Sequence, residues 1–173
     1  MNSLFLNRIF RACKLDPTVY EEVEADQSAT IQAALVVVLS SLAAGVGALS
    51  LGASNFLMAP VLSLISWYIW AYLIYFIGAK IFPEPNTKAD HGELLRTIGF
   101  SSAPGLIRIF GITPELMTIT FIGGGIWMLV AMIIAVRQAL DYESTWRAIG
   151  VVVIGFLVQA IVLIILLRIF GPA

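Results

Sequence analysis

The chain has 173 residues, of which 60% are hydrophobic and only 12% charged, and its net charge at pH 7 is −1. Soluble domains carry about a quarter charged residues, and one core of this size cannot bury so much apolar surface. These values exclude an ordinary soluble domain, and the near-zero charge gives no basic field for nucleic acid. The class that remains is an all-α integral membrane protein in a lipid bilayer.

Cysteine and histidine each occur once, as Cys13 and His91. A single cysteine forms no internal disulfide, and no cluster has metal-ligand spacing, so we expect neither a metal nor another cofactor. We expect His91 to lie exposed to solvent at a helix start. The hydroxyls of Ser101 and Ser102 have no nearby base in the sequence. We therefore predict no catalytic residues and a role that is not enzymatic.

Residues 2–14 predict a short amphipathic helix, because apolar side chains fall on one arc and Arg8, Arg11 and Lys14 on the other. The segment is too short and too charged to span a bilayer. Two arrangements are open: a helix in the membrane interface with its basic face toward anionic head groups, or a helix packed on the protein. Asp16 and Pro17 then predict an N-cap and first position of a second helix.

Hydropathy divides the chain into a cytoplasmic N-terminal region, residues 1–27, and a transmembrane domain, residues 28–173. Gln159 lies near the middle of the last apolar stretch, where an uncharged amide usually makes a hydrogen bond between helices. Four clear spans are expected, at about 31–51, 57–82, 117–136 and 148–167.

Residues 94–111 are apolar but carry arginines, serines, glycines and a proline, so their placement is ambiguous. Eleven residues separate Arg96 from Arg108, which is about 17 Å of helix against a hydrocarbon core of about 30 Å. One alternative is a short fifth transmembrane helix whose two arginines reach opposite interfaces. The other is four spans plus a re-entrant helix broken at Pro104 and Gly105.

The positive-inside rule fixes the orientation of the N-terminus but leaves this choice open. With a cytoplasmic N-terminus, both arrangements put eight of the ten Lys and Arg residues inside and two outside. The N-terminus is therefore predicted to be cytoplasmic in either case.

The segment 93–106 contains Gly99, Phe100, Ser101 and, three residues later, Pro104. It resembles the Gly-aromatic-Ser-x-x-Pro element of the Yip (Ypt/Rab-interacting protein) domain family, and the chain looks most like the short prokaryotic members. The resemblance implies a five-helix domain of a bacterial inner membrane, with the C-terminus on the periplasmic side. Eukaryotic relatives are associated with small GTPases, but their Asp-Leu-Tyr-Gly-Pro motif is missing at residues 16–20, so small-GTPase binding is not expected.

Two functions remain from this sequence. The first is a non-enzymatic scaffold or accessory subunit that organises membrane proteins, copies of itself or lipids through helix packing. The alternative is a small solute or ion transporter or channel that uses the broken helix 94–111. The candidate intramembrane polar contacts are Arg96, Arg108 and Gln159.

Overall fold

The computed structural model describes residues 3–49 and 58–170, in which all regular elements are helical. The predicted ends at residues 50–51 and 57 lie outside this part. In chain order the elements are α1 (Ser3–Cys13), α2 (Pro17–Ala25), α3 (Ala29–Gly47), α4 (Met58–Tyr75), the π-helix η2 (Phe76–Ile81), α5 (His91–Phe100), the 3-10 helix η3 (Ala103–Phe110), α6 (Pro114–Ala139) and α7 (Thr145–Phe170).

Four helical stretches of the described chain are long and apolar enough to cross a membrane. They correspond to the four clear spans expected from hydropathy, which are confirmed as helices. Their ranges are Ala29–Gly47, Met58–Ile81, Pro114–Ala139 and Thr145–Ile165.

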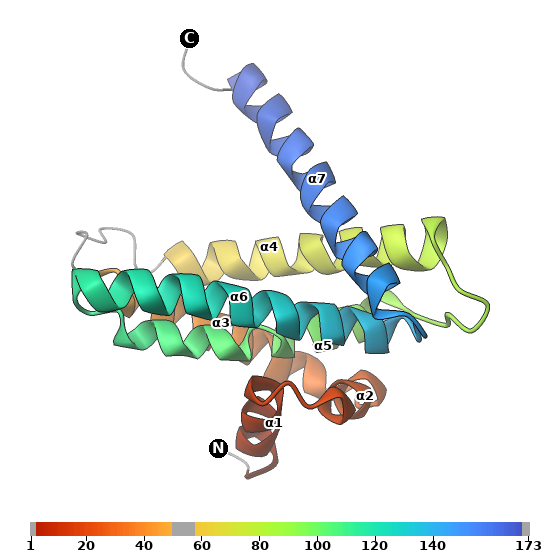
Figure 1. Ribbon diagram of the computed structural model, residues 1–173, viewed down its shortest axis with the longest axis horizontal. Coiled ribbons are helices and arrows are strands. Elements are labelled where there is room, and N and C mark those ends of the chain that lie inside the picture. Colours follow the sequence, from red (N-terminus) through yellow and green to blue (C-terminus); the bar gives the residue numbers. More distant parts are fainter. Residues whose placement is uncertain (1–2, 50–57, 171–173) are drawn as a thin grey trace.

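The ambiguous segment forms α5 and η3, which run beside α3 and α6 in the same layer (Figure 1). A Cβ on Gly99 would lie 2.6 Å from the Cβ of Ala33, and a Cβ on Gly47 would overlap the carbonyl oxygen of Arg108. The two segments are therefore parallel: residues 99 to 108 of α5 and η3 lie beside residues 33 to 47 of α3 and run in the same direction. Together, α5 and η3 extend along about 21 Å of α3 and do not reverse their direction.

The N-terminal helices pack beneath this layer (Figure 1), and their contacts bear on the two arrangements left open for residues 2–14. Arg8 pairs with Glu22 at 2.8 Å and with Asp26 at 2.9 Å, and its side chain is only 4% exposed. Arg11 pairs with Asp16 at 2.8 Å. Two basic residues of α1 thus contact acidic side chains of the same chain, as in a helix packed on the protein, because the consecutive segments α1 and 16–26 bring opposite charges together.

The prediction of an N-cap at Asp16 is confirmed. Asp16 is the N-cap of α2 and accepts a hydrogen bond from the Thr18 amide. Asp90 and Glu93 form a reciprocal capping box at the start of α5. His91, in contrast, is not simply exposed: its ring lies against three tyrosines of α4, with centroids 4.9, 5.5 and 6.4 Å away, and its Nε2 is buried. These tyrosines are Tyr68, Tyr72 and Tyr75.

The last helix, α7, leaves the layer at a steep angle (Figure 1). It crosses α4 at Gly155, where a Cβ would lie 2.9 Å from Ile74 and 3.1 Å from Trp70. Ahead of this point Val151 and Val152 are buried, whereas Leu157 and Ile161 beyond it are 59% and 57% exposed. The other helices therefore pack mainly against the first half of α7.

Candidate functional site

The motif residues Gly99, Phe100, Ser101 and Pro104 form the break between α5 and η3. Gly99 allows α5 to approach the backbone of α3, and Phe100 is fully buried. The Ser101 hydroxyl donates a hydrogen bond to the carbonyl oxygen of Ile98 at 2.7 Å. Pro104 lies in the first turn of η3, where its missing N–H costs no hydrogen bond. The motif therefore has a structural role: it ends one helix and starts another inside the bundle.

Close packing continues along η3 at Gly105. A Cβ at this position would lie 2.7 Å from the sulfur of Met128 and would overlap the Ser40 hydroxyl. A larger residue here would require the side chains of Ser40 and Met128 to move, which favours glycine between α3 and α6. The break and this glycine together bring η3 against both neighbours.

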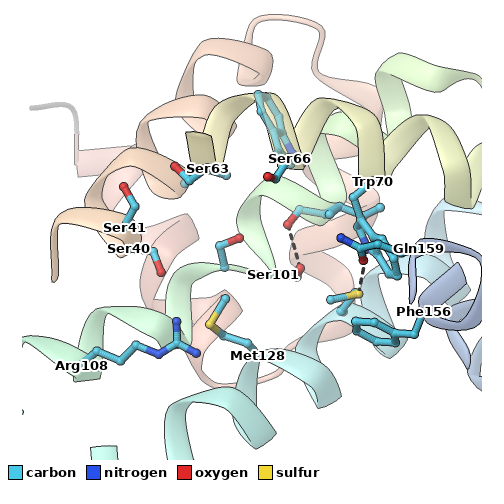
Figure 2. A pocket seen from close by; sticks show the side chains of 15 residues that line it. Ser40, Ser41, Ser63, Ser66, Trp70, Ser101, Arg108, Met128, Phe156 and Gln159 are labelled. Atoms are coloured by element: carbon cyan, nitrogen blue, oxygen red, sulfur yellow. Dashed lines mark hydrogen bonds between the residues drawn. The ribbon is translucent and has the colours of Figure 1, made fainter. Parts of the chain in front are cut away.

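An open cavity of about 310 Å³ lies beside the break, lined by side chains of α3, α4, α5, η3, α6 and α7 and of the turn at 101–102. Arg108 lines one end and Gln159 the other (Figure 2). No acidic residue is among the lining residues. Six hydroxyls also line the cavity, those of Ser40, Ser41, Ser63, Ser66, Ser101 and Ser102.

Several cavity groups are already engaged within the protein. Ser41 donates to the carbonyl oxygen of Val38 and Ser63 to that of Pro60, both at 2.8 Å. The Trp67 indole donates to the carbonyl oxygen of Leu95 at 3.0 Å, and the Trp70 indole contacts the sulfur of Met132 at 3.2 Å. These bonds hold the walls, and the two indoles tie α4 to α5 and α6.

Arg108 is the cationic residue of this cavity. Its guanidinium carbon lies 5.4 Å from the ring centre of Phe121, and its Nε is buried without a hydrogen-bond partner in the described residues. The side chain crosses α6 over two consecutive glycines, since a Cβ on Gly124 or Gly125 would lie 3.6 or 3.7 Å from guanidinium nitrogens. The absence of side chains at these two positions leaves room for the arginine.

The structure separates the three candidate polar residues. Arg108 and Gln159 line the same cavity. Arg96 lies elsewhere: it is 6% exposed and its Nε donates to the carbonyl oxygens of Val23 at 2.9 Å and Glu24 at 3.1 Å. Gln159 is exposed and has no side-chain hydrogen bond within residues 3–49 and 58–170, so the expected bond between helices is not present there.

Sequence reasoning missed the serines of α3 and α4 as parts of one site. A signal was available in α4, where Ser63 and Ser66 are three residues apart and so share a face of an otherwise apolar helix. In α3 the signal is weaker: Ser40 and Ser41 are adjacent and do not share a face, but both are polar residues in an apolar span. Nothing local indicates that these faces meet.

A second hollow, of about 480 Å³, lies between α2, α5 and the loop after α6. Glu21, Glu24, Glu93 and Asp141 line it together with Arg137. Burial, with the carboxylates of Glu93 and Asp141 as smaller causes, raises the pKa of Glu24 to about 7. In the described residues, no group of three or more His, Cys, Asp or Glu could hold a metal ion.

The raised pKa of Glu24 predicts that the stability of the protein depends on pH. The pKa of Glu24 is raised to about 7 in the folded protein, so the folded state binds a proton that the unfolded state lacks as pH falls from 8 to 5.5. Stability is expected to rise by about 1–2 kcal/mol over this range. The Glu24→Gln variant should be more stable than the parent at pH 8 and should lack the rise, as measured by thermal unfolding in detergent. An unchanged pH profile in that variant would contradict the assignment.

Four long apolar helices, a broken fifth element and a cavity lined with hydroxyls define a multi-pass helical membrane protein. The Yip1 domain family model matches residues 16–167, and the chain belongs to that family. The resemblance at residues 93–106 is thereby confirmed. No curated protein and no solved structure matches the chain.

Proposed function

We propose that this chain is a non-enzymatic scaffold or accessory subunit of a bacterial inner membrane, with five crossings and a cytoplasmic N-terminus. In this arrangement the C-terminus is periplasmic. Partners are other membrane proteins or a second copy, bound through helix packing in the bilayer.

The direction of α5 and η3 supports the fifth crossing. A re-entrant helix would return residue 111 to the side on which residue 91 begins. Instead, Gly111 lies near Gly47 at the end of α3, since a Cβ on Gly111 would lie 3.2 Å from the carbonyl oxygen of Gly47. Glu93 lies at the opposite end, beside Glu24. In this arrangement α5 and η3, placed end to end, cross the bilayer as one longer helix would.

The observation that carries the scaffold role is the departure of α7 from the bundle. Helices associate in lipid mainly by packing and hydrogen bonds between them. Beyond Gly155, the face of α7 with Leu157, Ile161 and Ile164 is more than half exposed. A span that leaves its own bundle presents this face to another helix, which supports a partner outside this chain.

Photo-crosslinking in native membranes tests this role. A benzophenone amino acid at Leu157 or Ile161 should give discrete protein adducts under light. The matched control is Ile126 on α6, which is 60% exposed and should give lipid adducts only. An added mass equal to the chain's own 18.8 kDa would identify a second copy as the partner. Lipid adducts alone at both α7 positions would contradict the proposal.

The cavity favours a second candidate, a small solute or ion transporter. Polar groups at membrane depth commonly line a path, and the broken helix contributes Arg108 and Ser101 to this one. The two functions differ in flux: purified protein in liposomes would move a solute in the second case and none in the first.

A further inference from the structure

The cavity contains a partly buried cationic group, and no carboxylate is among the described residues that line the cavity. We propose that it binds the anionic headgroup of a membrane lipid, and that the groove between α4 and α7 holds the acyl chain. Arg108 lines the cavity with its Nε buried and unbonded within the described residues, and no carboxylate lines the cavity with it. A guanidinium that is partly withdrawn from water is stabilised by an opposite charge or strong acceptors, which a ligand in the cavity can supply.

The cavity hydroxyls suit such a headgroup. The hydroxyls of Ser41, Ser63 and Ser101 already donate hydrogen bonds to backbone carbonyls. Ser40, Ser66 and Ser102 line the same space and have no side-chain hydrogen bond in residues 3–49 and 58–170. Each can donate to an anionic oxygen, and together with Arg108 they provide the set of donors that a phosphate or carboxylate requires.

Two apolar grooves continue from the cavity toward the lipid. The first, about 290 Å³, lies between α4 and α7 and shares Ser66, Trp70 and Gln159 with the cavity. The second, about 410 Å³, shares Gln159 and Phe156. Their other lining side chains are mainly aliphatic or aromatic, among them Ile69, Leu73, Phe76, Val158 and Val162. A site that is cationic at one end and apolar at the other fits an amphiphile rather than a free anion.

The orientation of this site matches a lipid in a bilayer. Arg108 lies beside Gly47, at the end of the bundle remote from α1 and α2. The groove extends from Ser66 in the middle of α4 toward Phe76 near its end. A headgroup at Arg108 is therefore near one interface, and its chain runs past the bilayer centre toward the far end of α4.

Quenching of tryptophan fluorescence by brominated lipid measures occupancy, because Trp67 and Trp70 line the cavity. The background carries Trp127→Phe and Trp146→Phe, so that emission comes from the two cavity tryptophans. Protein in mixed micelles is titrated with chain-brominated phosphatidylglycerol or phosphatidylcholine. We expect the anionic lipid to quench at about tenfold lower mole fraction than the zwitterionic lipid.

Two variants test the two halves of the site. Arg108→Ala should abolish the preference for phosphatidylglycerol, and Arg108→Lys should retain part of it. The matched control Arg168→Ala removes an exposed arginine of α7 and should leave the preference unchanged. Val162→Phe, which fills the groove, should weaken quenching by both lipids, whereas Ile126→Phe on the exposed face of α6 should not.

Other outcomes would overturn the proposal. A preference that survives Arg108→Ala in a folded variant removes the role of the arginine. If inorganic phosphate displaces the lipid at equal concentration and Val162→Phe has no effect, the site takes a small anion and not a lipid. Where the alanine variant fails to fold, the lysine and Val162 variants decide the question.

Discussion

Replacement of Gly99 by valine is expected to lower the free energy of unfolding by about 3 kcal/mol, the upper part of the range for overpacked interiors. The reason is the contact between α5 and α3: a Cβ at position 99 would lie 2.6 Å from the Ala33 Cβ and 3.2 Å from its backbone. Backbone cannot rotate away as a long side chain can, so the two helices must separate. Denaturation of purified protein in detergent, followed by helical circular dichroism, measures the change.

Gly123→Val is the matched control for this experiment. Gly123 is also a helical glycine, but it is exposed on α6 and a Cβ there would meet nothing within 4 Å. The control should unfold within about 0.5 kcal/mol of the parent, since it changes helix propensity and little packing. An equal loss of stability in both variants would mean that position 99 needs the backbone conformation of glycine rather than the close approach of α3. Gly99→Ala should fall between the two, because it adds the Cβ alone.

Features that depend on local sequence were predictable here. Long apolar runs specify the four clear helices, and the caps at Asp16 and Asp90 follow from side chains that reach backbone groups a few residues away. The anomaly of residues 94–111 was also visible, because Pro104 and the serines before it disfavour a continuous helix. The direction of this segment relative to α3 was not predictable from charge, because both arrangements place the same number of Lys and Arg residues on the cytoplasmic side.

Features made by residues distant in sequence were predicted poorly. For Arg8 the sequence left contact with lipid head groups and contact with the protein both open, because its partners Glu22 and Asp26 lie in the next helix and directly after it. His91 was expected in solvent, but the tyrosines that cover it lie in α4. The cavity has the same character. Arg108 and Gln159 were already candidates together, but nothing in the hydropathy pattern indicates that the serines of α3 and α4 lie beside them.

Arg96→Ala is expected to detach α2 from the bundle and to cost about 3 kcal/mol. The Arg96 guanidinium donates to the carbonyl oxygens of Val23 and Glu24, in the last turn of α2. These carbonyls lack partners inside their own helix, and a cation at a helix C-terminus is further favoured by the helix dipole. Each hydrogen bond to a charged group contributes about 1.5–3 kcal/mol. Loss of the side chain leaves acceptors unsatisfied in a nearly dry site.

Hydrogen exchange measured by mass spectrometry in detergent distinguishes this role from a lipid-facing one. In Arg96→Ala, amides of residues 17–25 should exchange faster by tenfold or more, and those of α3 much less. Arg137→Ala is the matched control, because Arg137 also donates to two backbone carbonyls, those of Tyr142 and Glu143, but outside α2. It should leave exchange in α2 unchanged. If instead Arg96 served to reach the membrane interface, Arg96→Lys would restore stability fully. A lysine lacks the fork that reaches two carbonyls, so the docking role predicts only partial recovery.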